Sequence, residues 1–267
     1  STVGGTFSTG VTPMFPLTIY DANNWARRQL EAGRSVRDCF EHVRTAPSPA
    51  IVVWDGDNST KLRRAIYPEY KKQRPAMRED LRQQFRFLEA LIHLTHVTSI
   101  KVDGIEADDV IAHLANEWKV GPVTVFSNDR DLLQIQSVQL NDEVKLACPR
   151  RYLRHFKTLV GDPADNIPGI PNFGAKSFEK IPTSYLDTIE VMLTDGNADV
   201  ALIGLLEPYC NSTTKKWLNM PGNIEQLYRF WEIIGFLRVP ERKLNTGTTI
   251  GRNVPEQADE ILRSVFQ

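Results

Sequence analysis

Acidic residues follow three short apolar stretches of the chain. Asp21, Asp55 and Asp129 each come after a stretch of β-branched residues without polar alternation. Such stretches are typical of strands that are buried on both faces of a parallel sheet. The carboxyl ends of parallel strands form the functional crevice of an open sheet, so we expect the three acids to converge. One Asp after a strand is equally typical of a turn or a helix cap, but three before helices favour a site.

A second group of acids opens a predicted helix. Glu106, Asp108 and Asp109 fall within four residues, just before apolar residues at helical spacing. The helix dipole favours acids in a first turn, but three carboxylates exceed what capping requires. Their mutual repulsion is costly unless a cation lies among them. The full set of candidate metal ligands is Asp21, Asp55, Glu106, Asp108, Asp109, Asp129, Asp131, Asp162 and Asp165.

The chemistry of this donor set is that of a hard divalent cation. Oxygen ligands without histidine or cysteine suit Mg²⁺ or Mn²⁺ rather than zinc, and so many acids indicate two or more ions. Two ions roughly 3.5–4 Å apart activate a water and stabilise the leaving oxygen in phosphodiester hydrolysis. The five histidines show no ligand spacing. The sequence lacks a Gly-x-x-x-x-Gly-Lys phosphate loop, which argues against an NTPase.

A basic segment with two tyrosines lies between the second and third predicted strands. It runs over residues 61–75 and carries Tyr67 and Tyr70. Three arginines follow at four-residue intervals on one face of the next predicted helix: Arg78, Arg82 and Arg86. Arginines alone would indicate an ordinary solvated face. Basic side chains for phosphates together with aromatic rings for unstacked bases favour a single-stranded nucleic-acid groove.

Residues 167–177 have the pattern of a tight hairpin between two helices. Gly169 and Gly174 permit close approach of the backbone, and Asn172 tolerates a positive φ. Backbone N–H groups at the start of the following helix can hold a phosphate. The same pattern is also compatible with a helical corner that binds no ligand.

The elements that must position these residues alternate between strands and helices. The predicted strands lie at residues 17–20, 51–54, 99–102 and 123–126, with residues 144–147 as a further option. The helices between them give the β-α-β rhythm of an α/β fold with a mostly parallel central sheet. Amphipathic helices over residues 224–236 and 256–266 are expected to pack against this sheet, and residues 238–254 are predicted to form a loop.

Length and composition are those of an ordinary globular chain. The 267 residues are 41% hydrophobic and 24% charged, enough to bury a core. A net charge of −1 excludes a histone-like polycation but not a nucleic-acid partner, because charges can be segregated. Three scattered cysteines without disulfide or zinc spacing favour a reducing cytoplasm. We expect no membrane span and no secretory signal, and we interpret residues 1–16 as a flexible lead-in.

Four motifs, in this order, resemble the 5′-nucleases of the flap endonuclease superfamily. They are residues 67–74 (YPEYKKQR), 104–110 (GIEADDV), 128–132 (NDRDL) and 161–170 (GDPADNIPGI). The resemblance covers about residues 17–180 and is greatest to the bacterial and phage 5′-3′ exonuclease branch, which includes the N-terminal nuclease domain of DNA polymerase I. It departs at Asn172 and Phe178, where the family's hairpin has smaller residues.

The resemblance implies a domain organisation and an activity. It implies a PIN-like nuclease domain over residues 17–148 with a helical arch at about 74–95. A helical DNA-binding region would follow over residues 149–267, with a helix-hairpin-helix at about 159–181. The implied protein is a cytoplasmic, monomeric hydrolase that cuts phosphodiester bonds at 5′ ends and 5′ flaps of branched DNA, and RNA primers, in replication and repair.

The resemblance also implies roles for individual residues. The nine acids would hold two or more Mg²⁺ or Mn²⁺ ions, directly or through water, and the hairpin would hold a K⁺ ion. Lys71 and Arg74 would contact the scissile phosphate at the base of the arch. The expected DNA contacts are Tyr67, Tyr70, Arg78, Arg82, Arg86, Gly169, Asn172, Gly174, Lys176 and Ser177.

Two alternatives stay open at this point. The first is a branched-DNA-binding protein that keeps the fold without catalysis, which the intact acidic set disfavours. The second is a ribonuclease of the PIN type, which has a similar acidic crevice. The basic segment and the hairpin favour a nuclease of DNA junctions over a PIN-type ribonuclease. Because members of the family also remove RNA primers, RNA–DNA hybrids are included among the expected substrates.

Overall fold

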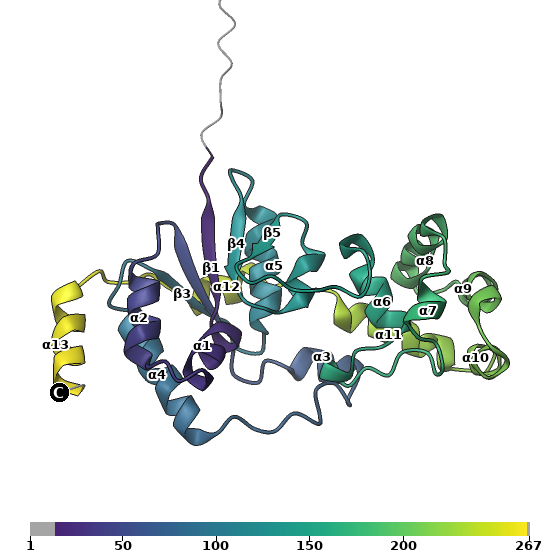
Figure 1. Ribbon diagram of the computed structural model, residues 1–267, viewed down its shortest axis with the longest axis horizontal. Helices are drawn as coiled ribbons and strands as arrows, with labels where there is room; N and C mark the ends of the chain where they lie inside the picture. Colours follow the sequence, from purple (N-terminus) through teal and green to yellow (C-terminus); the bar gives the residue numbers. More distant parts are fainter. Residues whose placement is uncertain (1–13, 266–267) are drawn as a thin grey trace, which may run out of the picture.

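The computed structural model describes residues 14–265. A six-stranded sheet in the order β5-β4-β1-β2-β3-β6 forms its centre (Figure 1). The strands are β1 (Leu17–Asp21), β2 (Ala50–Trp54), β3 (Thr98–Lys101), β4 (Val123–Phe126), β5 (Val138–Leu140) and β6 (Thr248–Thr249). All neighbours pair in parallel except β3 and β6. The predicted α/β class with a mostly parallel sheet is therefore confirmed.

The register of the central strands brings their carboxyl ends to one edge. Asp21 of β1 is paired with Val53 of β2, and Tyr20 is paired with Phe126 of β4. The residues that follow these strands therefore begin at the same level of the sheet. The optional strand at residues 144–147 is wrong, because the edge strand next to β4 is Val138–Leu140.

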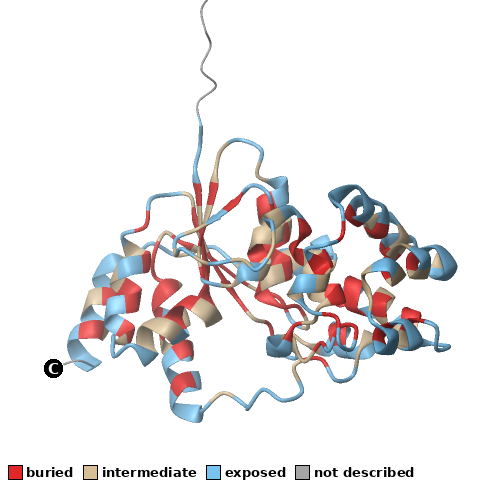
Figure 2. Cartoon of the chain, turned by 45° about the vertical axis from the view of Figure 1, so that its right-hand side comes forward, coloured by how far each residue is buried: buried red, intermediate tan, exposed pale blue. Residues whose placement is uncertain are grey.

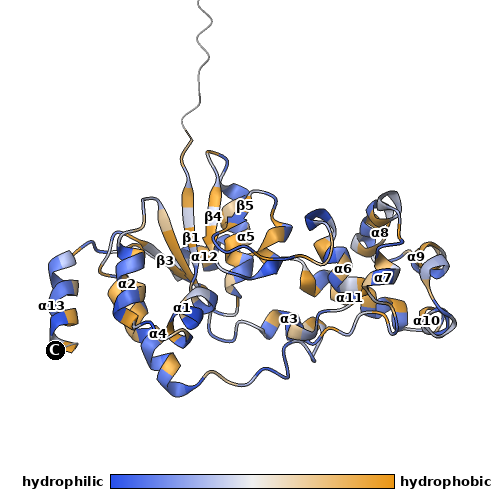
Figure 3. Cartoon of the chain, viewed as in Figure 1, coloured by the Kyte–Doolittle hydropathy of each residue, from blue (hydrophilic) through white to orange (hydrophobic). Residues whose placement is uncertain are grey.

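Helices cover both faces of the sheet. On one face Tyr20 and Val52 pack with α1 (Ala22–Glu31), α2 (Val36–Arg44), α4 (Glu79–Ile92) and α13 (Pro255–Val265). On the other face Ile19 and Val53 pack with α5 (Ala107–Glu117) and α12 (Glu241–Gly247). Alternate strand residues thus enter two separate cores, which is why the strands show no polar alternation. Figure 2 shows that much of the central sheet is buried, and Figure 3 shows that its strands are mostly hydrophobic.

A helical region with its own core adjoins the sheet (Figure 1). It contains α6 (Leu153–Leu159), α7 (Ala175–Phe178), α8 (Thr183–Asp195), α9 (Asp199–Leu206), α10 (Ser212–Leu218) and α11 (Asn223–Ile234). Short 3₁₀ helices interrupt the connections: η1 (Arg130–Gln134), η2 (Arg150–Tyr152), η3 (Pro163–Asp165) and η4 (Glu207–Tyr209). Helix α3 (Lys61–Ile66) lies at the junction and contacts α11. In the part of the chain that the structure describes, every helix is too short or too polar to cross a bilayer.

Two expectations about the connecting segments need correction. The arch predicted at 74–95 is not a free element, because α4 buries Leu81, Phe85 and Leu88 against the sheet side of the molecule. The segment that bridges the two regions lies before it, at residues 67–78 (Figure 1). Residues 238–254 are not a loop, since they contain α12 and β6.

The ends of the chain also differ from expectation in part. The predicted helix at 224–236 corresponds to α11, which packs in the helical region and not against the sheet. The predicted helix at 256–266 corresponds to α13, which does pack on the sheet side. Residues 1–13 of the predicted lead-in lie outside the described residues. Phe15 is anchored, because its N–H donates to Val120 O at 2.9 Å.

Candidate metal centre

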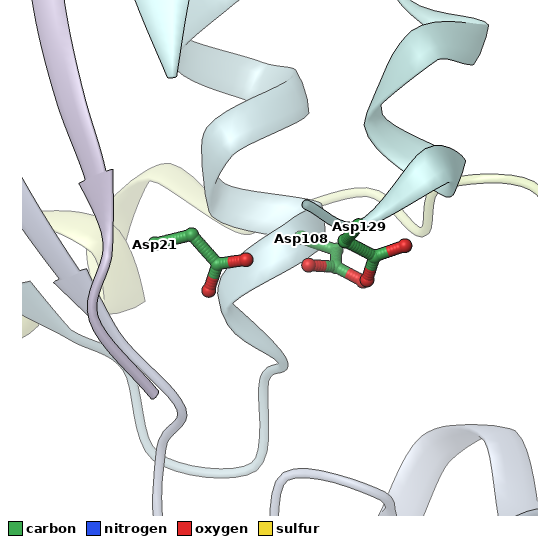
Figure 4. Close-up of side chains that lie close together, drawn as sticks. All are labelled: Asp21, Asp108 and Asp129. Carbon is green, nitrogen blue, oxygen red and sulfur yellow. The ribbon is translucent and has the colours of Figure 1, made fainter. Parts of the chain in front are cut away.

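Three carboxylates from separate elements meet at the carboxyl edge of the sheet. Asp21 ends β1, Asp108 lies in the first turn of α5, and Asp129 follows β4. One oxygen of each lies within 4.8 Å of an oxygen of the other two (Figure 4). Acids that are distant in sequence thus converge as predicted, and the strand ends bring them together.

Hydrogen bonds fix the turn that carries Asp129. The Ser127 hydroxyl donates to Asp21 Oδ2 at 2.7 Å and accepts from the Asp129 N–H at 3.0 Å. Asp129 Oδ1 accepts from the Asp131 N–H at 2.9 Å and so caps η1. This turn joins the first group of acids to a second one, because Asp131 belongs to that second group.

The second group consists of Asp131, Asp162 and Asp165, whose oxygens again lie within 4.8 Å of one another. The Lys157 ammonium contacts Asp131 and lies 2.9 Å from Asp162 Oδ2. Asp162 Oδ1 accepts from the Ala164 N–H at 3.1 Å, which starts the short helix η3. A cationic side chain therefore already lies among these carboxylates.

The hairpin between α6 and α7 depends on close contact between two glycines. Gly161 has a φ of 106° and Gly169 a φ of 63°, in the region that favours glycine. A Cβ on Gly169 would lie 2.5 Å from the backbone nitrogen of Gly161, so no side chain fits there. Asn172 has a positive φ of 57°, as predicted. The close approach expected at Gly174 is wrong, because a Cβ there would have no described atom within 4 Å.

Two adjoining cavities lie over the acids. The larger, of about 480 Å³, and the smaller, of about 270 Å³, are both lined by Asp108, Asp129, Lys71 and Arg74. The second group of acids lines the larger cavity, whereas Asp21, Asp55 and Glu106 line the smaller one. The geometry thus joins eight of the nine predicted acids and both predicted basic residues in one hollow.

Burial and mutual repulsion make these carboxylates hard to ionise together. Burial, helped by the charge of Asp129, raises the pKa of Asp21 to about 7. Burial and Asp129 also raise the pKa of Asp131 to about 7, although Lys157 opposes this shift. Burial and the same neighbour raise the pKa of Asp108 well above its ordinary value. A cation among the acids would remove this repulsion, so the donor set fits a hard metal ion.

Asp55 and Glu106 lie beside the first group of acids and not within it. Asp55 Oδ1 accepts from the Ala107 N–H at 2.8 Å, and burial raises the pKa of Asp55. Glu106 is buried, and its carboxylate accepts from Arg63 Nη1 at 2.7 Å and contacts the Lys71 ammonium. Burial opposes ionisation of Glu106, but Lys71 and Arg63 lower its pKa below the ordinary value. In this geometry Glu106 holds Lys71.

Lys71 and Arg74 come from the turn that follows α3. Lys71 has a positive φ of 51°, and its N–H donates to the carbonyl oxygen of Asp165 at 3.1 Å. Burial disfavours the charged form of Lys71, but Glu106 raises the pKa of Lys71 well above its ordinary value, so the ammonium persists. Arg74 Nη2 lies 2.8 Å from Asp165 Oδ1. Both cations are thereby fixed at the rim of the acids.

Asp109 is a correction to the predicted ligand set. Both of its oxygens are taken by the Arg63 guanidinium, at 2.6 and 2.7 Å, and Oδ1 also accepts from the Leu237 N–H. Arg63 further donates to the carbonyl oxygens of Ile233 and Gly235 at the end of α11. Asp109 is therefore part of a buried ion pair that joins α5 to the helical region, and it is turned away from both groups of acids.

The two tyrosines also differ from their predicted role. Tyr70 is buried, and its hydroxyl donates to Glu106 Oε2 at 3.1 Å, so its ring is not available to a base. Tyr67 is half-buried; its ring packs edge-on against Phe230 and its hydroxyl donates to Asn166 O. The sequence predicts that the two tyrosines stack on unpaired bases, whereas in the structure they support the turn.

The predicted basic surface residues lie on exposed parts of the molecule. Arg78 and Arg82 are exposed and pair with Asp80 and Glu79, at 3.0 and 2.9 Å. Such exposed pairs are weak and leave the guanidinium groups free to exchange partners. Of the other predicted DNA contacts on helices, Arg86 of α4 and Lys176 of α7 are exposed, and Ser177 of α7 is half-buried.

Sequence reasoning missed two residues around the acids, Lys157 and Arg28. Lys157 lies five residues before Asp162, at the spacing of a helix followed by a turn, and nothing local marks it as part of the site. Arg28 lines the smaller cavity, and its Nη2 is buried without a partner among the described residues. Its signal was present, because Asn24 and Arg28 share the helix face that starts at Asp21.

Comparisons with known proteins agree with this geometry. Residues 30–156 match the family model described as "5′-3′ exonuclease, N-terminal resolvase-like domain". The chain is similar to a 5′-3′ exonuclease of Aquifex aeolicus, with 36% identity over 155 residues, which is 52% of this chain and 53% of that protein. It is also similar to the flap endonuclease Xni of Shewanella amazonensis, with 32% identity over 63% of this chain and 68% of that protein.

A solved structure shares the fold. The flap endonuclease of bacteriophage T5, in a complex with DNA and metal ions, has a TM-score of 0.56 and 20% identity, covering 95% of this chain and 100% of that chain. The matched part of the present chain spans about half the length of the Aquifex relative and about two thirds of the Shewanella relative.

Proposed function

The chain belongs to the 5′-3′ exonuclease and flap endonuclease family, and from this premise we propose that it is a divalent-metal-dependent 5′-nuclease. Its substrates are the 5′ ends and 5′ flaps of branched DNA, in replication and repair in the cytoplasm. One observation carries the proposal. Two groups of three carboxylates, with Lys71 and Arg74 at their rim, line adjoining cavities at the carboxyl edge of the sheet.

The residues of each group suit a particular task. Asp21, Asp108 and Asp129 would hold one Mg²⁺ or Mn²⁺ ion, and Asp131, Asp162 and Asp165 a second, with Asp55 and Glu106 acting through water. Ions bound there supply an activated water and offset charge on the leaving oxygen. Lys71 stabilises negative charge that develops on the phosphate, and Arg74 orients it.

We further propose which residues outside the metal centre contact the DNA. Arg78, Arg82 and Arg86 would contact the 5′ single strand, and the hairpin around Gly169 the duplex, with a K⁺ ion that rests on the resemblance alone. Contacts to phosphates do not distinguish DNA from RNA, so an RNA–DNA hybrid is included as a substrate. We also propose that the protein is a monomer, as the resemblance implies.

A flap substrate with a 5′ label tests this function. We expect Mg²⁺-dependent cleavage near the junction, mapped at single-nucleotide resolution, and no cleavage in EDTA. A matched RNA flap and a blunt duplex are the comparison substrates. Binding of the flap by the wild-type protein without any cleavage in Mg²⁺ or Mn²⁺ would contradict the proposal and favour a non-catalytic branched-DNA-binding protein.

Mn²⁺ should stabilise the fold more strongly as the pH rises from 5.5 to 7.5. Asp21 and Asp131 have a pKa of about 7 in the folded metal-free protein, against 3.8 ordinarily. Protonation of these two carboxyls in the folded state contributes stability that is fully present below the ordinary pKa of 3.8. This contribution is lost as the pH rises through the folded-state pKa of about 7. A bound cation requires the ionised form, and at a hundredfold excess over Kd it adds about 3 kcal/mol. Thermal unfolding with and without Mn²⁺ measures this; an increment that is independent of pH would count against the site.

Asp108→Asn and Asp109→Asn should have opposite effects although the residues are neighbours. Asp109→Asn breaks a buried ion pair, which costs about 3–5 kcal/mol and lowers the Tm by about 10 °C, but the stabilisation by Mn²⁺ should persist. Asp108→Asn removes a ligand and a repulsive charge, so the metal-free Tm should not fall and the stabilisation by Mn²⁺ should shrink. Thermal unfolding of both variants gives the answer. Loss of the Mn²⁺ effect in Asp109→Asn would return Asp109 to the ligand set.

A further inference from the structure

A second charged cavity lies between η1, the beginning of α6 and the end of α11. Its volume is about 330 Å³, which is within the range of small-ligand pockets. It uses different residues of α6 from the metal centre, because Arg154 and His155 line it, whereas Lys157 lines the acidic hollow. Three arginines and one carboxylate line this cavity, which gives the lining a net positive charge: Arg150, Arg151, Arg154 and Glu190.

Two of the three arginines form no ion pair within the described part of the chain. Arg151 is paired with Glu190, with an N–O distance of 2.7 Å. Arg150 and Arg154 donate to backbone carbonyl oxygens, and in residues 14–265 neither forms an ion pair. Burial lowers the pKa of Arg154 to about 10, although Glu190 and Glu232 oppose this shift, which shows that the buried guanidinium charge still carries a cost. An anion in the cavity would remove that cost.

The wall of the cavity is built around Arg154. Its guanidinium carbon lies 4.0 Å from the centroid of the Trp231 ring. Gly235 leaves the space for it, because a Cβ at Gly235 would lie 2.4 Å from the same carbon. A side chain at that position would therefore displace the guanidinium from the ring.

His155 contributes a neutral imidazole ring to the lining of the cavity. It is 1% exposed, its Nε2 lies 3.1 Å from Leu186 O, and its Nδ1 has no hydrogen-bond partner among the described residues. Burial lowers the pKa of His155 to about 4, so the ring is neutral at physiological pH. A neutral ring that donates from Nε2 leaves Nδ1 unpaired, and because this atom is fully buried, the ring forms part of the cavity wall and adds no charge to it.

We propose that this cavity binds a phosphate group, carried by a free nucleotide or by a nucleic-acid strand. The guanidinium groups of Arg150 and Arg154 would face the phosphate oxygens, for which their planar donors are suited. The proposal does not rest on nuclease activity, because it uses none of the residues of the metal centre.

The test uses the full chain in EDTA, so that no cleavage takes place. Inorganic phosphate is titrated at constant ionic strength, with chloride as the control, while NMR follows the Trp231 indole N–H. We expect a saturable shift with phosphate and none with chloride; equal responses overturn the proposal. A deoxynucleoside 5′-monophosphate and a short DNA duplex are then titrated separately. A shift with the nucleotide alone assigns the site to free nucleotides, and a shift with the duplex assigns it to a strand.

Gln136 offers a matched pair of variants that leaves the arginines in place. It lines the cavity, is exposed, and has no side-chain hydrogen bond in the described part of the chain. Gln136→Glu should weaken phosphate binding about threefold to tenfold, and Gln136→Lys should strengthen it to a similar extent, as expected for one charge near the ligand. Identical affinities in both variants and the wild type would overturn the assignment, even if phosphate shifted the indole signal.

Discussion

Asp129→Asn is expected to abolish cleavage of a 5′ flap, by about a thousandfold or more, while the flap still binds. The charge of Asp129 acts on Asp21, Asp108 and Asp131, so this residue links the two groups of acids. Asparagine keeps the shape but removes the charge that a metal ion requires. A loss of several kcal/mol of transition-state stabilisation corresponds to this factor, at about 1.4 kcal/mol for each tenfold change.

The comparison that isolates this effect is a single-turnover rate in Mg²⁺ beside a binding measurement in EDTA. Glu117→Gln is the matched control, because Glu117 is an exposed acid at the far end of the same helix as Asp108. It should cleave like the wild type. The metal-free Tm of Asp129→Asn should rise, since repulsion among buried carboxylates is relieved. A variant that keeps a tenth of the wild-type rate would show that Asp129 is not a metal ligand.

The strand ends were predictable because their sequence pattern has few competing explanations. Short β-branched stretches that are apolar at every position fit strands covered on both faces, and the rule for parallel sheets then brings Asp21 and Asp129 to one edge. The prediction needed no knowledge of the partners. It required only the position of each acid relative to the end of its strand.

The ligand set could not be separated residue by residue from sequence. Asp108 and Asp109 are adjacent, and one step along a helix turns a side chain by about 100°. Asp108 consequently faces the acids, whereas Asp109 faces Arg63, which is 46 residues away in the chain. Local sequence gives no sign of which acid a distant arginine will take.

The packing of α4 and the presence of strand β6 could not be predicted for a similar reason. A helix in an arch and a helix packed on a core can have the same apolar stripe at helical spacing. In this structure Leu81 and Phe85 of that stripe are packed in the core. β6 has two residues, and it forms because β3 offers it an edge. Tyr70 likewise becomes a core residue through its contact with Glu106. These outcomes are set by tertiary contacts.

Lys71→Met is expected to slow single-turnover cleavage about a hundredfold to a thousandfold, with flap affinity changed about threefold at most. The ammonium is fixed by Glu106 and by the backbone of Asp165, at the rim of both cavities. A donor that is held in place before the reaction costs no reorganisation when charge develops on the phosphate, which is the source of its large effect on rate. Methionine keeps the length of the side chain and removes the charge.

The neighbouring lysine separates this role from a general attraction to DNA. Lys72 is the next residue along the chain, and it is exposed and pairs with Glu69. Lys72→Met therefore removes the same charge at a position outside the two groups of acids. If Lys71 acts on the phosphate in the transition state, only Lys71→Met loses rate, and it does so at saturating DNA. If both variants lose affinity and neither loses single-turnover rate, the charge of this turn merely attracts the strand, and the metal centre would then have to stabilise the transition state without Lys71.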